Sequence, residues 1–526
     1  MKPIHVSLAL LGAVLAPAAA PAADVPPNVI LVLADDLGAK ELSCYGNREH
    51  KTPNLDRMAA EGARFETFFA NPLCTPTRVA LMTGQYGFRN GFLGMADPAF
   101  TPAGTSPQKQ IGNHFTHADL LKSKGYATAL AGKWQLSGEH PTLIRDAGFD
   151  EYRMWAYDHN LPDGIKHPAH EKGGQACRYW HPSIVENGTY LQTKPDDYGP
   201  DFFNDFVIDF ARRHKDGPFF VYYTSVLTHS PHLETPDPAQ PGKRWPATFK
   251  SNIEYLDHLM GRLLAALKAD GLDEKTLVIF LGDNGTGGSG KGTVTELGAR
   301  VPCIIRGPGV KPGLVVRAVG DLTDILATLA EVSGAELPKD KPFDGHSLGP
   351  VLRGETEKHR AWIYSHLDDG RILRDGRWLL EIAKGGKGEK FFDCGDSRDG
   401  TGYKDVTGSS DLEVKAARAR FAEILAGMPE PKPRDGLAAK PEKRKKGGGE
   451  RTKDAASTEA PAPAGKVDRF PKRDLNGDGA LDREEFMKTM TGKDPAGGEA
   501  RFKSMDIDGD GRVTREEFLR VVEGAK

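Results

Sequence analysis

The chain has no hydrophobic run long enough to cross a membrane as a helix. Its apolar stretch at residues 6–15 is far shorter than the ~20 residues that a spanning helix needs, and no other segment fits one. A preceding lysine and the small residues Ala20–Ala23 are typical of a secretory signal over residues 1–23. The alternative is an uncleaved anchor. We therefore expect a secreted or periplasmic protein with no membrane span.

Cysteine is scarce and net charge is small. The five cysteines, at positions 44, 74, 177, 303 and 394, are odd in number, and connectivity cannot be deduced from sequence, so no disulfide is predicted. Cys303 lies in an apolar segment and is expected to be a small buried hydrophobe. The net charge of -3 favours neither the presence nor the absence of polyanionic partners, and no nucleic-acid partner is predicted.

Two apolar runs each stop at acidic or amide residues. The run 28–33 is followed by Asp35 and Asp36, and the run 276–281 by Asp283 and Asn284. Continuous apolar runs of this length are typical of strands buried in a parallel sheet, whose carboxyl ends form the usual ligand site. Oxygen donors of this kind suit Ca²⁺ or Mg²⁺. The alternative is that these residues only form turns and helix caps.

The segment Cys74-Thr75-Pro76-Thr77-Arg78 matches the pattern C-x-P-x-R. With the acidic strand ends, it makes the chain from about Asn28 to Asp393 resemble the sulfatases, a branch of the alkaline-phosphatase-like superfamily. The resemblance implies that a formylglycine-generating or other sulfatase-modifying enzyme oxidises Cys74 to formylglycine (3-oxoalanine). In that family one oxygen of the hydrated aldehyde attacks sulfur, and the other allows sulfate to be expelled.

The resemblance also implies a role for each matching residue. Arg78 would hold the nucleophile, Lys133 and Lys291 would bind the sulfate, and His229 would assist the leaving oxygen. A metal, Ca²⁺ or Mg²⁺, would be bound by Asp35, Asp36, Asp283 and Asn284 with the modified Cys74. These types suit a sulfate ester, because cations stabilise its spreading negative charge and an imidazole can protonate an alkoxide.

Two positions depart from the family pattern. Gln135 stands where the family often has histidine after Gly-Lys-Trp, and glutamine cannot donate a proton as an imidazolium does. The family's Tyr-Glu-Gly-Gly is reduced to residues 295–298, Thr-Glu-Leu-Gly. We assign Gln135, His232 and Arg300 to substrate binding.

Alternating apolar strands and helices predict an α/β fold. Strands are expected at 126–131, 219–225 and 276–281, and an amphipathic helix at 252–269, giving a largely parallel sheet flanked by helices. Further on, strand patterns at 362–365, 372–382 and 391–393, with a turn at Asp375-Gly376, predict a small antiparallel sheet followed by a helix at 411–428. The family places such a sheet beside its active site.

Residues 155–181 mix aromatic side chains with lysine, arginine and histidine. Aromatic faces beside cations suit a sulfated sugar. A zinc site at His167, His170 and Cys177 is an alternative, but the paired close spacings of zinc ligands are missing. The third alternative is an insertion packed only for shape.

Past Met428 the composition changes to proline, glycine and charge, including a basic cluster at 443–446. Such a segment buries too little apolar surface to fold, which predicts a linker. Its basic cluster could bind anionic glycans or nucleic acid, but solvated linker charges are the favoured interpretation. Two matches to D-x-[DN]-x-[DN]-G-x₅-E follow and predict a separate all-α EF-hand pair that binds Ca²⁺, with Leu481 and Val513 able to pair the loops. The ligands would be Asp474, Asn476, Asp478, Asp482 and Glu485 in the first loop, and Asp506, Asp508, Asp510, Arg512 (backbone) and Glu517 in the second.

These patterns predict five segments. They are a signal peptide (1–23), a catalytic α/β domain (24–354), its antiparallel subdomain (355–428), a linker (429–466) and the EF-hand pair (467–526). The expected activity is hydrolysis of sulfate esters of carbohydrates. The alternatives are a phosphodiesterase or phosphonate monoester hydrolase of the same superfamily, and an inactive calcium-dependent glycan-binding protein.

Overall fold

The computed structural model describes most of the chain up to residue 429. The described ranges are 26–94, 111–136, 142–156, 161, 164–170, 177–429, 480–483, 486, 502, 505–506, 508, 510–514 and 517. The chain divides into two compact units, Met1–Ala438 and Ala439–Lys526. Within the described ranges no helix has the length and apolarity needed to span a bilayer. The predicted signal segment and residues 430–466 of the predicted linker (429–466) lie outside the described residues.

A ten-stranded sheet forms the centre of the first unit, in the order β13-β2-β12-β11-β1-β8-β4-β5-β6-β7. Its five middle strands, from β11 to β5, are all parallel to one another, whereas β12, β6 and β7 pair antiparallel with their neighbours toward the edges. The predicted largely parallel sheet is therefore confirmed. The strands are β1 (Asn28–Ala34), β2 (Ala63–Phe65), β4 (Ala127–Gly132), β5 (Glu151–Trp155), β6 (Ile184–Glu186), β7 (Thr189–Tyr190), β8 (Phe219–Thr224), β11 (Thr276–Gly282), β12 (Cys303–Arg306) and β13 (Leu314–Val316).

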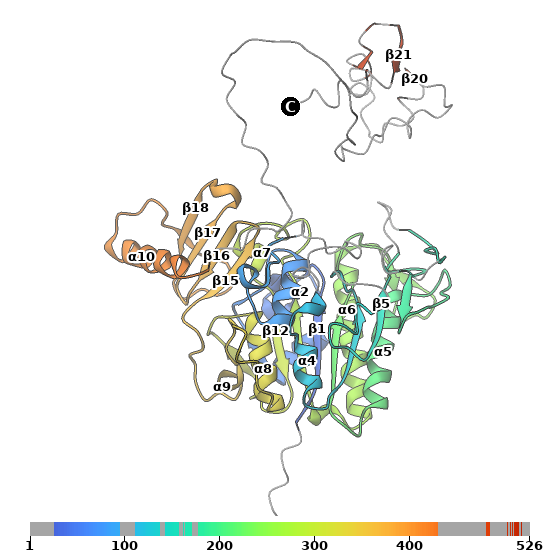
Figure 1. Ribbon diagram of the computed structural model, residues 1–526, viewed down its shortest axis with the longest axis horizontal. Coiled ribbons are helices and arrows are strands. Elements are labelled where there is room, and N and C mark those ends of the chain that lie inside the picture. Colours follow the sequence, from blue (N-terminus) through green and yellow to red (C-terminus); the bar gives the residue numbers. More distant parts are fainter. Residues whose placement is uncertain are drawn as a thin grey trace, which may run out of the picture. The chain divides into compact units, whose positions relative to one another are not determined.

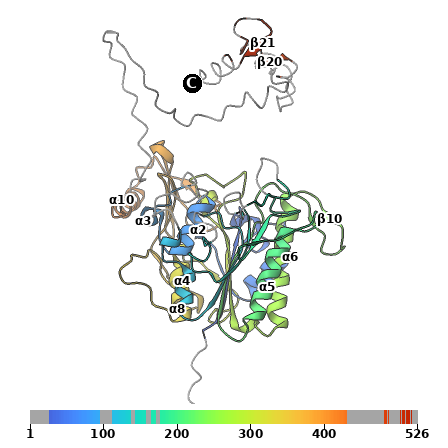
Figure 2. The same ribbon diagram turned by 45° about the vertical axis from the view of Figure 1, so that its right-hand side comes forward.

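Helices cover both faces of this sheet, with α5 and α6 on one side and α2, α4 and α8 on the other (Figures 1 and 2). The pleat of β1 explains the two layers, because Val29 and Leu31 join the core beneath α8 whereas Ile30 and Val32 join the core beneath α6. A strand buried on both faces has no polar side, which is why its sequence is a continuous apolar run. The helices are α1 (Pro53–Ala60), α2 (Cys74–Thr83), α3 (Gly87–Asn90), α4 (His117–Lys122), α5 (Gly199–Arg213), α6 (Phe249–Ala269), α7 (Glu296–Ala299), α8 (Thr323–Ser333), α9 (Gly349–Leu352) and α10 (Leu412–Ala426).

The predicted helix at 252–269 is α6, which begins three residues earlier. Thr248 explains that start, because its hydroxyl accepts the N–H of Ser251 (3.0 Å) and caps the first turn. Two minor two-stranded pairs lie outside the large sheet, β3 (Phe68–Phe69) with β14 (Gly320–Asp321) and β9 (Thr235–Pro236) with β10 (Arg244–Trp245).

The second region is an antiparallel sheet of five strands with α10 packed on it (Figure 1). It comprises β15 (Ile363–Leu367), β16 (Gly370–Arg374), β17 (Trp378–Ile382), β18 (Glu389–Asp393) and β19 (Lys404–Asp405). The predicted turn at Asp375-Gly376 joins β16 to β17, and Asp375 accepts the backbone N–H groups of Arg377 (2.7 Å) and Trp378 (2.6 Å). The antiparallel subdomain is confirmed, and none of the five cysteines, all within described ranges, forms a disulfide.

The second unit is described only in part. β20 (Ala480–Asp482) pairs antiparallel with β21 (Arg512–Thr514), and Leu481 lies opposite Val513, as the sequence suggested. Both apolar side chains are fully buried. This bridge connects the two predicted calcium loops.

Candidate active site

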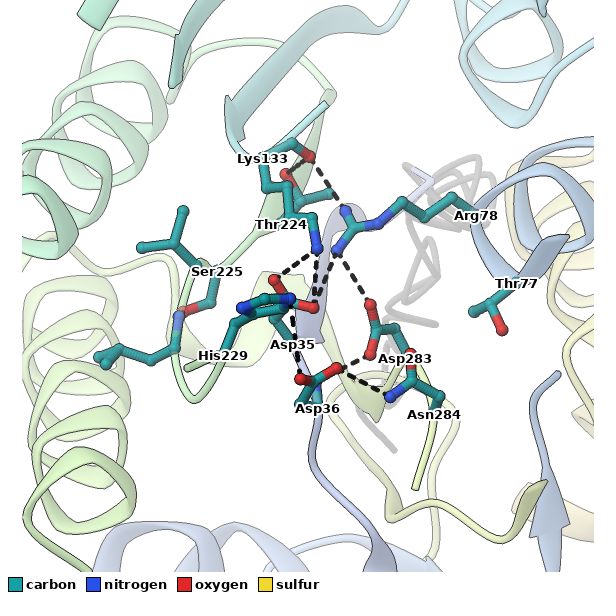
Figure 3. Close-up of polar contacts among 12 residues, drawn as sticks. Asp35, Asp36, Thr77, Arg78, Lys133, Thr224, Ser225, His229, Asp283 and Asn284 are labelled. Carbon is teal, nitrogen blue, oxygen red and sulfur yellow. Dashed lines mark hydrogen bonds and ion pairs between the residues drawn. The ribbon is translucent and has the colours of Figure 1, made fainter. Parts of the chain in front are cut away.

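The predicted site residues meet at the carboxyl ends of neighbouring parallel strands (Figure 3). Asp35 and Asp36 follow β1, and Asp283 and Asn284 follow β11, which pairs with β1 along its whole length. Lys133 follows β4, and the loop with His229 follows β8, the strand between β4 and β1. Because all these strands run the same way, their ends converge on one edge of the sheet.

Each carboxylate in this cluster is paired with a cation. The Lys133 ammonium donates to both oxygens of Asp35 (2.9 and 2.7 Å). Lys291 lies 2.7 Å from one oxygen of Asp36 and 2.9 Å from the other. The Arg78 guanidinium donates to Asp283 (3.1 Å) and to the backbone carbonyl of Lys133 (3.0 Å).

The oxygen-rich side of the cluster fits a hard divalent cation. Asp36 receives the Asn284 side-chain amide (2.9 Å), and its own N–H donates to Asp283 (2.9 Å), which places these donors side by side. The buried Oδ1 of Asn284 has no hydrogen-bond partner among the residues that the structure describes. A buried acceptor without a donor is costly, and a metal ion would satisfy it. Three carboxylates and one amide oxygen are donors that Ca²⁺ and Mg²⁺ accept.

Burial and charge separate the pKa values of the carboxyls. Burial raises the pKa of Asp35, but the surrounding cations, Lys133 foremost, outweigh it and hold that pKa well below its usual range. Burial, reinforced by the charge of Asp35, raises the pKa of Asp283 to about 7. A cation bound between the two would favour the ionised form of both.

Cys74 is the first residue of α2 and is buried. Burial raises the pKa of its thiol, so unmodified Cys74 is a neutral thiol and a weak nucleophile at neutral pH. The loop before it is tied down by Thr77, whose hydroxyl receives the N–H of Asn71 (2.9 Å) and donates to its carbonyl (3.1 Å). The Asn71 side chain in turn accepts the backbone N–H of His366 in β15 (3.1 Å). The antiparallel subdomain therefore supports the loop that carries Cys74.

His229 faces the carboxylates from the loop after β8. Its Nε2 lies 3.8 Å from Asp36, and its Nδ1 is 2.6 Å from the carbonyl of Ser230. Burial lowers the pKa of His229 to about 4. Its neighbour Thr228 donates its N–H to the carbonyl of Asp35 (2.6 Å), which joins this loop directly to the strand end that carries Asp35 and Asp36.

The three predicted substrate residues have different surroundings. Gln135 is buried and has a left-handed backbone (φ 55°) two residues after Lys133. His232 packs against the ring of Phe249 (5.1 Å between centroids), and burial lowers its pKa. Arg300 donates to the carbonyls of Glu66 (2.9 Å) and Asp399 (2.8 Å), contacts that connect the sheet to the antiparallel subdomain. Substrate binding by these residues stays a prediction.

Within residues 155–181, the described side chains support packing more than a zinc site. Tyr179 is fully buried, and the Arg178 guanidinium lies over the Trp155 ring (4.1 Å). Cys177 donates its thiol to the carbonyl of Trp180 (2.7 Å). Among the described residues, the groups placed to hold a metal are Asp35, Asp36 and His229, and Asp506, Asp508 and Asp510.

The sequence did not predict the residues that fix the site through hydrogen bonds with backbone groups. Thr224, the last residue of β8, donates its hydroxyl to the carbonyl of Lys133 (2.6 Å). Asn71 and Tyr179 likewise act on the site through backbone groups. None of them belongs to a motif with a chemical signature, so only their contacts identify them.

The second EF-hand loop is arranged as a calcium loop requires. Asp506 accepts the N–H of Gly511 (3.0 Å), whose φ of 84° needs a glycine. Glu517 accepts the N–H groups of Asp508 (3.3 Å) and Thr514 (2.9 Å), which places its carboxylate across the loop. Of the first loop, Asp482 is described, and Asp474, Asn476, Asp478 and Glu485 lie outside the described residues.

Comparison with known proteins gives two family matches. The sulfatase family model matches residues 27–335, and the EF-hand domain pair model matches residues 468–523. Steryl-sulfatase of Mus musculus is 32% identical over 468 residues, covering 72% of this chain and 74% of that protein. N-acetylgalactosamine-6-sulfatase of Canis lupus familiaris is 32% identical over 378 residues, covering 64% of this chain and 68% of that protein.

Solved structures share the fold. Ps i-CgsB, solved in complex with k-i-k-neocarrahexaose, has a TM-score of 0.62 at 23% identity, covering 76% of this chain and 92% of that chain. The phosphonate monoester hydrolase of Agrobacterium radiobacter has a TM-score of 0.55 at 20% identity, covering 76% of this chain and 95% of that chain. These likenesses establish the alkaline-phosphatase-like architecture.

Proposed function

The chain belongs to the sulfatase family, and we propose that it hydrolyses sulfate esters of carbohydrates through a formylglycine made from Cys74. One observation carries the proposal. Cys74 begins a helix at the same sheet edge where three carboxylates, one amide and three cations converge. A phosphate- or sulfate-transferring centre needs this combination of a metal site and fixed positive charge.

The metal site would consist of Asp35, Asp36, Asp283 and Asn284, together with the modified Cys74. The bound Ca²⁺ or Mg²⁺ would polarise the sulfate as a Lewis acid. In the structure the carboxylates engage Lys133, Lys291 and Arg78. A cation would compete for the same oxygens, so that the ammonium groups become available to the non-bridging oxygens of the substrate.

Charge counting supports an anionic substrate. Three buried or half-buried cations face three carboxylates in the cluster, so the side chains alone nearly cancel. A divalent cation leaves a positive excess, which attracts the negative sulfate group and stabilises the charge that grows as the ester bond breaks.

Formylglycine, when hydrated, supplies a hydroxyl nucleophile in place of the thiol. Its position is set by this chain's own contacts: Thr77 fixes the preceding loop through Asn71, and Arg78 is held between Asp283 and the carbonyl of Lys133. The raised pKa of the buried Cys74 thiol argues that an unmodified enzyme would be a poor catalyst. A sulfatase-modifying enzyme is therefore the proposed maturation partner.

His229 would protonate the leaving oxygen once the negative charge of the bound sulfate ester has raised its pKa from the value of about 4 that burial gives it. Its imidazole lies beside Asp36 on the same side of the cluster as the Lys133 ammonium (Figure 3). A sugar alkoxide is strongly basic and leaves slowly without a proton. Gln135 would contribute neutral hydrogen bonds only.

A carbohydrate substrate is supported by the surroundings of the His229 loop. Trp180 donates its indole N–H to the carbonyl of Glu234 (2.8 Å), five residues after His229, and the Arg244 guanidinium lies 3.8 Å from its ring centroid. Aromatic rings with cations are suited to sulfated sugars. The N-acetylgalactosamine-6-sulfatase relative acts on such a sugar by its name, whereas the steryl-sulfatase relative points to a sterol. A secreted or periplasmic location is proposed from the signal pattern of residues 1–23.

The decisive experiment compares Cys74→Ala with Cys303→Ala. Cys303 is equally buried but lies in β12, within the core. We expect Cys74→Ala to fold normally and release no sulfate, whereas Cys303→Ala stays active. Mass spectrometry of the Cys74 peptide, from a host with the modifying enzyme, should show the aldehyde. Wild-type sulfate release by Cys74→Ala would overturn the assignment.

The substrate class can be determined by comparing turnover of matched sulfate, phosphate and phosphonate esters. We expect aryl sulfate to be hydrolysed much faster than the corresponding aryl phosphate or phosphonate monoester. The opposite order would favour the phosphonate hydrolase alternative. No turnover of any ester by enzyme carrying the aldehyde would favour the inactive glycan-binding alternative. Comparing turnover of galactosamine 6-sulfate with turnover of a steryl sulfate then shows whether the enzyme prefers a sugar or a sterol.

A further inference from the structure

The proposed proton donor sits on a segment without regular structure. Residues 225–230 after β8 form neither helix nor strand, so the orientation of His229 depends on what its loop contacts. From the sheet side, Asp35 donates its N–H to the carbonyl of Leu227 (2.8 Å), and Thr228 donates back to the carbonyl of Asp35 (2.6 Å). These bonds hold the middle of the loop.

The opposite side of the loop is held by one tyrosine. The Tyr179 hydroxyl donates toward two backbone carbonyls, that of Val226 (3.1 Å) and that of His229 itself. The first carbonyl lies at the start of the loop and the second belongs to the proposed proton donor. One hydroxyl therefore spans the turn and fixes the backbone from which the imidazole projects.

Tyr179 is itself rigidly placed. Its side chain is fully buried, its ring stacks on that of Tyr198 (6.2 Å, 23° between planes), and its carbonyl accepts the N–H of Gly199 at the start of α5 (2.7 Å). Gly199 leaves no room for adjustment, because a Cβ there would lie 2.1 Å from the carbonyl oxygen of Arg178. The tyrosine is thus anchored to a fifteen-residue helix.

We propose that Tyr179 is a positioning residue that aims the His229 imidazole at the leaving oxygen of the substrate. The inference rests on the proposed function and adds a residue that lies outside the sequence motifs of the site. Tyr179 is fully buried, so it would not touch the substrate. It acts through the backbone carbonyls that it holds.

The test uses two tyrosines that differ in their hydroxyl contacts. Tyr179→Phe keeps the buried ring and removes the donor to the loop. Tyr198→Phe is the matched control, because Tyr198 is also buried and stacks on the same ring, yet within the described part of the chain its hydroxyl has no hydrogen-bond partner. Thermal unfolding of both variants monitors the fold.

Kinetics on aryl sulfates with phenols of increasing pKa, and on a sugar sulfate, provide the readout. General acid catalysis contributes about 10²–10⁴-fold, so misaiming the donor should lower kcat about tenfold or more on the sugar sulfate. The change on nitrophenyl sulfate should stay within about twofold, since that leaving group needs little protonation. KM should not change. Tyr198→Phe should show neither effect.

A double variant separates positioning from general weakening. If Tyr179 acts through the imidazole, Tyr179→Phe should add no leaving-group dependence in a His229→Ala background. A uniform loss across all leaving groups, the same dependence in Tyr198→Phe, or additive losses in the double variant would overturn the positioning role while leaving the sulfatase assignment intact. Absence of sulfate release by the aldehyde-bearing wild-type enzyme would overturn the proposed function and this role with it.

Discussion

Replacing Gly132 by alanine should damage both the stability and the active site of this enzyme. Gly132 ends β4, has a φ of 103°, and lies opposite Thr224 in the parallel register. A Cβ at this position would lie 1.9 Å from the Thr224 carbonyl oxygen. That oxygen accepts the N–H of Lys133 (2.8 Å), so the two strand ends must separate at Lys133.

The cost has two parts that can be separated. An L-residue forced into a left-handed backbone loses about 1–2 kcal/mol, and forcing an atom into a packed site costs about 1–3 kcal/mol more. The free energy of unfolding should therefore fall by about 2–5 kcal/mol. Activity should fall too, because the Lys133 carbonyl holds Arg78 (3.0 Å), and a displacement near 1 Å at a catalytic group can cost about 10²-fold.

Gly125 is the matched control. It precedes the same strand and has a φ of 80°, but nothing lies within 4 Å of a Cβ placed on it. Gly125→Ala should lose only the backbone part, about 1–2 kcal/mol, and keep kcat/KM. Urea denaturation at fixed calcium and kcat/KM on an aryl sulfate measure both variants. Equal losses of stability, or a fully active Gly132→Ala enzyme, would refute the argument from close packing.

Three further outcomes are expected. A chain ending at Ala438, the boundary of the first unit, should keep kcat/KM on an aryl sulfate, and a chelator should still abolish its turnover. A tenfold fall in kcat/KM, roughly 1.4 kcal/mol, would show that the EF-hand pair assists the active site. His229→Ala should slow a sugar sulfate far more than nitrophenyl sulfate, whereas Gln135→Ala should slow both alike; the reverse pattern would exchange their roles. Arg78→Lys should lower kcat/KM by about 10²-fold because a single ammonium cannot reproduce both guanidinium contacts. Arg64→Lys changes a guanidinium that lies over the Tyr45 ring, so it should cost some stability and leave kcat/KM nearly unchanged; comparable losses of kcat/KM in both variants would contradict this expectation.

The parallel core could be predicted because its strands are buried on both faces. Asn28–Ala34 and Thr276–Gly282 are apolar throughout and pair residue for residue, so pattern and structure agree closely. The acidic residues after them could be predicted to meet, because parallel strands end at the same edge. The antiparallel additions at the sheet edges were not anticipated, since β6 and β7 are three and two residues long and carry too little periodicity to be distinguished from loops.

The contacts that hold the catalytic groups in place could not be predicted from the sequence. Arg300 illustrates the difficulty: it was assigned to substrate binding, and its hydrogen bonds to the carbonyls of Glu66 and Asp399 could not be predicted. A residue pattern does not show which backbone carbonyls accept side-chain hydrogen bonds, because every residue has one. Their partners become visible only when the backbone path is known.

The site depends on segments that lie far from its motifs in the sequence. Asn71 joins the Cys74 loop to β15, 295 residues later in the chain, and Tyr179 joins the His229 loop to the start of α5. A motif lists the groups that face the substrate, whereas catalysis needs those groups held to within a fraction of an ångström. The antiparallel subdomain and the Tyr179 segment supply that constraint from two sides. A variant that keeps every motif residue but loses these backbone contacts should fold and bind metal, yet turn over slowly.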